Sequence, residues 1–264
     1  MVGLRRLATA ETGNMAKNLE SISALFPAYN DASTIGGLVE ETVELLRTTG
    51  RDFEVIVVDD GSKDATALVL EECQKHHPGR VRVIRHGVNR GYGAALRSGF
   101  QAAAKDLVFY TDGDGQYDPN EMPRLLERLQ PSTGMVNGYK IKRRDPLYRI
   151  LIGKVYNTTI RLLFGIRVRD VDCDFRLIRR DWLQRLNLRS DSGVICLELV
   201  LALETLGCPI EEVPVPHYPR IAGRSQFFRW RSLLSTLGQL LHLLYRKRIA
   251  GPSPAERVAN SAAD

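Results

Sequence analysis

The sequence contains no run of about 18 apolar residues, the length that a membrane-spanning helix needs. Residues 1–20 carry two arginines but no apolar core, so we expect no signal peptide. The five histidines show no metal-ligand spacing, and no CxxC pair occurs among the four cysteines, Cys73, Cys173, Cys196 and Cys208. These absences predict a protein of a reducing compartment, without a zinc site and without a membrane span.

A glycine fingerprint is missing from the turn after the first predicted strand. Dinucleotide-binding Rossmann proteins carry G-x-G-x-x-G at that place, whereas residues 27–33 here are Pro-Ala-Tyr-Asn-Asp-Ala-Ser. The pair Gly91 and Gly93 comes too late in the chain, and Leu96 stands where the third glycine would be. The sequence therefore argues against a nicotinamide-dependent dehydrogenase.

Acidic residues are scarce in two segments. Residues 219–248 contain seven Lys/Arg and no acid, and residues 140–180 contain twelve Lys/Arg against four Asp. The chain of 264 residues has a net charge of only +6, so the remainder is acidic. Such basic segments indicate an anionic partner, namely phosphates, an anionic lipid surface or nucleic acid, and a solvated basic face is the alternative. Because no RNA-binding motif accompanies them, a nucleic-acid-binding protein is a rival hypothesis and we expect no nucleic acid partner.

Hydrophobic periodicity predicts an α/β fold. Apolar runs typical of buried strands alternate with amphipathic segments typical of helices. The expected strands are residues 22–26, 53–58, 81–84, 107–110 and 135–141, and the expected helices are residues 33–47, 65–75, 93–104 and a helix beginning at 118. This alternation predicts a mostly parallel sheet with helices on both faces. Ligands of such sheets bind at the carboxyl ends of the strands.

The most informative of these strand ends carries two carboxylates. The apolar run at 107–110 is followed by Asp112, Gly113 and Asp114. Mg²⁺ and Mn²⁺ bind such oxygen ligands and are often shared with substrate phosphates. An EF-hand beginning at Asp112 is excluded, because its sixth position is Tyr117 and its twelfth is Pro123. A simple polar turn is the alternative, since Asp and Gly are common turn residues.

Several short motifs recur in an order and spacing that resemble a known family. They are PxYN at 27–30, VVDDGS at 57–62, NxGxG at 89–93, DxDxQ at 112–116, GYK at 138–140, DCDFR at 172–176 and EVP…RxxGRS at 212–225. Together they resemble the inverting GT-A glycosyltransferases of family 2 related to dolichol-phosphate mannose synthase, in the polyprenyl-phosphate branch. The resemblance implies transfer of a hexose from a nucleotide sugar, of UDP-glucose or GDP-mannose type, to a polyprenyl phosphate with Mg²⁺ or Mn²⁺.

The resemblance also implies roles for the matching residues. Asp60 would accept a hydrogen bond from the base, and the nucleotide-sugar set would be Pro27, Tyr29, Asn30, Asp31, Asp60, Gly91, Asp112, Gly113 and Asp114. The metal ligands would be Asp112, Asp114 and Gln116. The acceptor phosphate would contact Lys140, Arg149, Arg176, Arg220 and Ser225. The catalytic set would be Asp112, Asp114, Arg149, Arg176 and Glu198.

Three positions depart from that family pattern. Asp31 stands where relatives often carry Glu, and Lys140 stands where the polyprenyl branch usually has Arg. Gly153 replaces the Ser that usually follows four residues after the arginine at 149. A transfer to a soluble saccharide or small hydroxyl compound on the same fold is therefore the second hypothesis.

The acceptor decides whether a general base is needed. An ionised lipid phosphate brings its own nucleophilic oxygen, whereas a hydroxyl acceptor needs a base. Glu198 is the first candidate for that base, followed by Asp172 and Asp174. The alternative for Glu198 is the polar face of a helix at 194–206, and the two aspartates could instead pair with neighbouring arginines.

Two basic segments with interleaved apolar residues, 147–164 and 227–248, indicate helices that lie on a membrane surface. Core or subunit-contact helices are the alternative, and the sequence allows a homo-oligomer. The expected organisation is a flexible arm at 1–20, a catalytic domain at 21–226, a basic amphipathic helix at 227–248 and a disordered tail at 249–264. Within the domain, 21–140 would bind nucleotide sugar and metal, and 141–226 would bind the acceptor. The expected location is peripheral, on the cytoplasmic face of a membrane.

Overall fold

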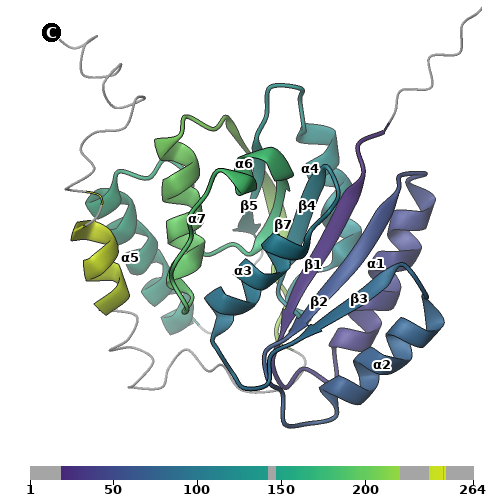
Figure 1. Ribbon diagram of the computed structural model, residues 1–264. Helices are drawn as coiled ribbons and strands as arrows, with labels where there is room; N and C mark the ends of the chain where they lie inside the picture. The colour runs from purple at the N-terminus through teal and green to yellow at the C-terminus, as the bar shows by residue number, and fades with distance from the viewer. Residues whose placement is uncertain (1–18, 142–146, 221–237, 246, 248–264) are drawn as a thin grey trace, which may run out of the picture.

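A seven-stranded sheet forms the centre of the computed structural model, which describes residues 19–141, 147–220, 238–245 and 247 (Figure 1). The strand order is β3-β2-β1-β4-β6-β5-β7, and only β6 runs antiparallel to its neighbours. The strands are β1 (Ile22–Ala28), β2 (Phe53–Asp59), β3 (Val81–Arg85), β4 (Leu107–Thr111), β5 (Met135–Ile141), β6 (Phe175–Arg179) and β7 (Ile210–Pro216). The mostly parallel α/β prediction is confirmed, with one antiparallel strand inside the sheet.

Helices cover both faces of this sheet. One face packs against α1 (Ile35–Thr48), α2 (Thr66–His76) and α4 (Met122–Arg128), which follows the short 3₁₀ turn η1 (Pro119–Glu121). The other face packs against α3 (Tyr92–Ala102), α5 (Leu147–Phe164), α6 (Arg180–Gln184) and α7 (Val194–Thr205). A helical segment at 238–245 adds Leu243 to the second core.

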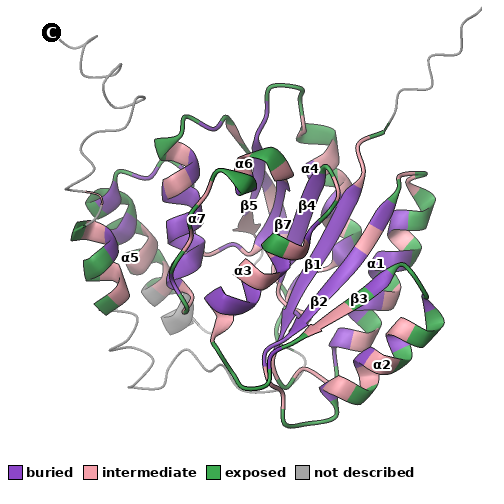
Figure 2. Cartoon of the chain, in the orientation of Figure 1, coloured by how far each residue is buried: buried purple, intermediate pink, exposed green. Residues whose placement is uncertain are grey.

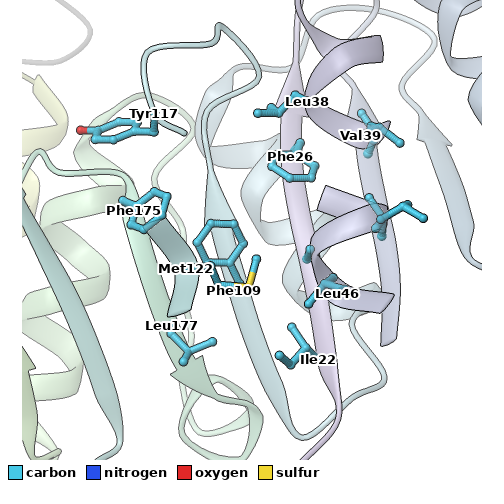
Figure 3. Packing of buried hydrophobic residues seen from close by; sticks show 14 of the residues in the cluster. Ile22, Phe26, Leu38, Val39, Leu46, Phe109, Tyr117, Met122, Phe175 and Leu177 are labelled. Carbon is cyan, nitrogen blue, oxygen red and sulfur yellow. The ribbon is translucent and has the colours of Figure 1, made fainter. Parts of the chain in front are cut away.

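Alternation along the strands feeds both cores. In β2, Val55 and Val57 belong to the core on the α1 side, whereas Ile56 and Val58 belong to the core on the α3 side. This is the period-2 pattern of a strand that is buried on both faces, and it explains why the sequence is apolar without interruption. In Figure 3, Phe109 lies between Phe26 and Phe175, with ring centroids 6.5 Å and 5.0 Å away.

The five expected strands and the helices between them are present, with ends that differ by at most two residues when η1 is taken as the start of the last helix. The sequence did not predict β6 and β7. β6 mixes arginine with apolar residues, and β7 carries two glutamates and two prolines. Proline removes a ladder donor and is tolerated on edge strands, and β7 forms one edge of the sheet.

Two further predictions concern the chain ends and the membrane. The expected arm, the tail and residues 227–237 of the expected amphipathic helix lie outside the described residues, apart from 19 and 20. Within residues 19–141, 147–220 and 238–245, no helix combines the length and apolar character that a membrane span requires. Several large apolar residues of α5 are exposed, and Figure 2 shows exposed stretches along this helix.

Candidate active site

The centre of the candidate site is the loop that leaves β4 at its carboxyl end. Asp112 accepts a hydrogen bond from the Tyr92 hydroxyl at 2.7 Å, which fixes one of its oxygens. Asp114 is 5% exposed and forms an ion pair with Arg220, with nitrogen and oxygen 2.5 Å apart. Between them, a Cβ on Gly113 would lie 2.8 Å from the Pro27 carbonyl oxygen, so the tip of β1 leaves no room for a side chain.

Several carboxylates converge on this loop with little positive charge. Burial raises the pKa of Asp112 well above its usual value, and the nearby carboxylates of Asp174 and Asp114 raise it further. Burial likewise raises the pKa of Asp114, while the guanidinium of Arg220 opposes that shift. Oxygen donors that repel one another in this way suit a divalent cation.

No group of three or more His, Cys, Asp or Glu residues with metal-holding geometry occurs in the described part of the chain. A cation at Asp112 and Asp114 would therefore complete its coordination with oxygens from ligand or water, which is the usual arrangement for Mg²⁺. The donor chemistry fits the predicted metal in this limited sense.

Gln116, the third predicted metal ligand, has a visible structural role. Its side-chain nitrogen donates to the Tyr218 carbonyl at 3.1 Å, and the Tyr218 backbone N–H donates to the Gln116 carbonyl at 2.9 Å. Its own N–H donates to Asp114 at 3.0 Å. These bonds tie the loop that carries Asp112 and Asp114 to the chain that follows β7, and they keep Arg220 beside Asp114.

The loop after β1 is held by its own predicted ligand residues. Asn30 has φ of 57°, in the left-handed region that Asn tolerates, and its side-chain oxygen accepts from the Lys63 N–H at 2.8 Å. Asp31 accepts from the Tyr29 N–H at 2.9 Å. Both side chains therefore shape the loop, and half-buried Tyr29 is presented at the end of β1.

Asp60 is 3% exposed at the carboxyl end of β2. Its carboxylate accepts from His86 Nδ1 at 2.6 Å and from the backbone N–H groups of Arg90 and Gly91 at 2.9 and 2.8 Å. Gly91 has φ of 99°, and a Cβ there would collide with the Asp191 carbonyl. Asp60 thus organises the glycine loop, a role that the sequence did not indicate beside the predicted base contact.

Arg176, predicted as an acceptor-phosphate and catalytic residue, lies inside the sheet, and that role stays a prediction. It is 0% exposed, because β6 sets it between Tyr110 and Asn137 of the neighbouring strands. Its guanidinium donates to Asn137 Oδ1 at 2.6 Å, to the Val171 carbonyl at 2.5 Å and to the Tyr110 hydroxyl. The guanidinium is thus used inside the protein.

Lys140 is also largely enclosed. Its ammonium lies 3.4 Å from Asp170 Oδ2 and donates to the Asp172 backbone carbonyl. Asp170 also receives the Asn157 side-chain amide at 3.1 Å. The predicted acceptor contact of Lys140 would require this pair to open.

Glu198, the first predicted candidate for a general base, is held by backbone hydrogen bonds. It is 4% exposed on α7, and its Oε2 accepts from the backbone N–H groups of Arg189 and Ser190 at 3.0 and 2.8 Å. The carboxylate holds the loop that contacts Gly93, since the Gly93 N–H donates to the Asp191 carbonyl at 2.9 Å. Glu198 therefore positions this loop, and its role as a general base stays a prediction.

For two predicted site residues, the side chain lies outside the described part of the structure. The backbone of Arg149 belongs to α5, but its side chain is not among the described parts. Ser225 lies outside the described residues. Asp172 is described, and burial raises its pKa to about 7 against the opposing charge of Lys140.

The sequence comparisons agree with this geometry. The model of the family described as glycosyl transferase family 2 matches residues 23–186, which is more than half of the chain. The chain belongs to glycosyl transferase family 2. The family resemblance that the motifs carried is confirmed.

Curated relatives in the family carry one recurring name. The undecaprenyl-phosphate 4-deoxy-4-formamido-L-arabinose transferase of Pectobacterium atrosepticum is 33% identical over 166 residues, covering 63% of this chain and 51% of the relative. The protein of that name from Edwardsiella ictaluri is 30% identical over 231 residues, covering 87% of this chain and 67% of the relative. The chain thus spans about half to two thirds of the length of these relatives.

Solved structures show the same fold. Glucosyl-3-phosphoglycerate synthase from Mycobacterium tuberculosis, crystallised with Mn²⁺, UDP and phosphoglyceric acid, superposes with a TM-score of 0.68 at 21% identity. The match covers 85% of this chain and 78% of that one. The complex of the same synthase with Mg²⁺ and UDP gives a TM-score of 0.66 at 20% identity, with 85% and 79% covered. At this identity the likeness establishes the GT-A type of fold.

Three residues that support the candidate active site were not predicted from the sequence. Tyr92 holds Asp112, and His86 links Asp60 to the Ser98 hydroxyl through its second ring nitrogen at 2.9 Å. The only signal for Tyr92 was its position between two motif glycines. His86 and Ser98 lie in no motif, and only the packing of α3 against β2 brings them together.

Proposed function

We propose that this chain is the catalytic part of an inverting glycosyltransferase. It would move a hexose from a nucleotide sugar to a polyprenyl phosphate, with Mg²⁺ or Mn²⁺, at a membrane surface. The observation that carries the proposal is the meeting of Asp112, Asp114 and Arg220 at the carboxyl end of β4. That edge of a parallel sheet is where α/β folds bind ligands.

The chain's own residues would prepare this reaction by holding and neutralising the donor. Asp112 and Asp114 would hold the cation, which when bound neutralises the leaving nucleoside diphosphate. Tyr92 would keep Asp112 oriented through its 2.7 Å hydrogen bond. Arg220 would supply a second positive charge beside the diphosphate. The structural neighbour was crystallised with UDP, which supports a nucleotide-sugar donor for this fold.

The lipid-phosphate acceptor is supported by the chemistry and by the relatives. Their shared name specifies undecaprenyl phosphate as acceptor. An ionised phosphate oxygen attacks without a general base, which agrees with a Glu198 that is engaged by two backbone N–H groups. The same name specifies a 4-deoxy-4-formamido-L-arabinose unit, so the donors to be tested include such a pentose beside UDP-glucose and GDP-mannose.

The membrane surface is supported by the exposed side of α5. Leu151, Val155 and Leu162 are exposed at positions four and seven residues apart, which places them on one helix face. Leu241 and Tyr245 are exposed on the helical segment at 238–245. Apolar residues beside basic ones are typical of interfacial helices. We place this surface on the cytoplasmic face, and the four free cysteines agree with a reducing compartment.

A soluble hydroxyl acceptor is the second candidate, and Asp172 favours it. Its pKa of about 7 is near that of an effective general base at neutral pH. Phosphoglyceric acid is bound in the structural neighbour. This candidate predicts a strict need for a carboxylate, whereas lipid-phosphate transfer does not.

The test is a transfer assay with purified protein. Nucleoside diphosphate release would be followed with undecaprenyl phosphate or phosphoglyceric acid as acceptor, with EDTA and with Mn²⁺ or Mg²⁺ restored. Asp114→Asn should lower turnover roughly 10³-fold, since metal stabilisation is worth several kcal/mol. The matched control is Asp118→Asn, because Asp118 only caps η1.

Each outcome has a definite meaning. Glu198→Gln should retain transfer to lipid phosphate if the protein stays folded. Activity that survives exhaustive chelation would refute the metal role. Transfer only to phosphoglyceric acid, with loss in Asp172→Asn, would replace the lipid acceptor by the soluble one.

A further inference from the structure

We propose that Arg220 is a built-in counter-cation for the metal-binding aspartates and that cation binding releases it for the nucleoside diphosphate. This inference rests on the proposed function, because it assigns a coupling device to the proposed metal site. The guanidinium of Arg220 would pair first with Asp114 and then with the nucleoside diphosphate. Metal and nucleotide binding would then be coupled through a single side chain.

The first observation is the position of Arg220 on Asp114. One guanidinium nitrogen lies 2.5 Å from Asp114 Oδ2, and the other carboxylate oxygen accepts the Gln116 N–H. A cation that binds through Oδ2 would need the place where the guanidinium now donates. The arginine and the cation therefore compete for one oxygen, and like charges that close repel each other.

The second observation is that the Arg220 side chain is more exposed than the Asp114 side chain. The Asp114 side chain is 7% exposed, whereas the Arg220 side chain is 31% exposed. The carboxylate is fixed by the loop, but the arginine reaches it from the surface and can swing away. The long Arg side chain allows such a movement without a change in the backbone.

The third observation is a pair of hydrogen bonds between Gln116 and Tyr218 that keeps Arg220 close. Gln116 and Tyr218 exchange two hydrogen bonds, of 3.1 and 2.9 Å, two residues before the arginine. A displaced guanidinium would therefore remain beside the loop. The nearest new anion would be the diphosphate bound at that loop, and Arg matches phosphate oxygens well in geometry and charge.

Competition followed by release has a thermodynamic signature. The cation first has to displace Arg220, which weakens metal binding in the absence of nucleotide. The freed arginine then strengthens binding of the nucleoside diphosphate. Since coupling between two ligands is reciprocal, nucleotide should tighten metal binding by the same factor.

The experiment measures binding, so it does not depend on turnover. Free Mn²⁺ would be followed by electron paramagnetic resonance during titration of the full chain without nucleotide. Arg220→Gln should bind Mn²⁺ about tenfold more tightly than the wild type, because the competing charge is gone. At saturating Mn²⁺, UDP or GDP should bind Arg220→Gln about tenfold more weakly by calorimetry. Arg220→Lys should lie between the two proteins.

Arg124→Gln is the matched control, because Arg124 pairs with Glu121 at the surface and lies outside the site. It should leave both affinities unchanged. If Arg220→Gln binds Mn²⁺ no more tightly than the wild type, the counter-cation role is refuted while the metal site stands. If neither protein binds Mn²⁺, the metal site fails and the inference fails with it.

Discussion

The two halves of the sheet neutralise their buried charges in different ways. At the ends of β1 and β2, Asp31 and Asp60 accept hydrogen bonds chiefly from backbone N–H groups. Around β5 and β6, Lys140 pairs with Asp170, while Arg176 is enclosed by neutral oxygens. The hydrogen bonds to Asp31 and Asp60 shape loops at the carboxyl ends of the strands. The contacts of Lys140 and Arg176 tie strands together in the core. The same residue types can therefore signal a ligand loop or a structural network.

The largest expected effect tests the structural side of this contrast. Arg176→Met should lower the free energy of unfolding by about 3 kcal/mol, because several buried oxygens would lose their donor. Asp31→Asn, the matched change in the other half, should cost about 1 kcal/mol or less, since an amide oxygen can still accept from the Tyr29 N–H. Urea unfolding followed by fluorescence measures both. If Arg176→Met is stable but inactive, that result would support the predicted contact of Arg176 with the acceptor phosphate.

The next effect in size concerns pH and the half-buried Asp172. Its folded-state pKa of about 7 lies above the unfolded value, so the folded protein binds an extra proton between about pH 4 and 7. The free energy of unfolding should therefore fall as pH rises through this range. Between pH 5 and 8 the loss attributable to this group is about 2.5 kcal/mol.

Asp172→Asn should remove that part of the pH dependence. The variant and the wild type should have similar stability at pH 5, and the variant should be the more stable at pH 8. Urea unfolding at both values measures the difference. Parallel stability curves would show that Lys140 keeps Asp172 ionised throughout, and the contrast between the two halves would weaken.

The same contrast explains which parts of the fold and of the candidate site could be predicted from the sequence. Mainly apolar runs predicted β1, β2 and β4 correctly, because burial on both faces leaves a strong local pattern. The DxD loop was located for a similar reason, since Asp112 and Asp114 stand together at a strand end. The burial of Arg176 could not be predicted, because it depends on the cross-strand neighbours Tyr110 and Asn137, which no local pattern contains.

The smallest expected effect concerns Tyr92, a structural residue that supports a predicted ligand residue. Tyr92 touches no proposed ligand, but its hydroxyl holds Asp112 at 2.7 Å. Tyr92→Phe keeps the ring and removes that hydrogen bond, which is worth about 1 kcal/mol or slightly more with a charged acceptor. We expect transfer activity to fall roughly fivefold to tenfold and the apparent Mn²⁺ affinity to weaken by a similar factor. Thermal unfolding should change little, because the packing of α3 is unaltered. Activity and metal affinity equal to wild type would show that the Asp112 loop is held by its backbone alone.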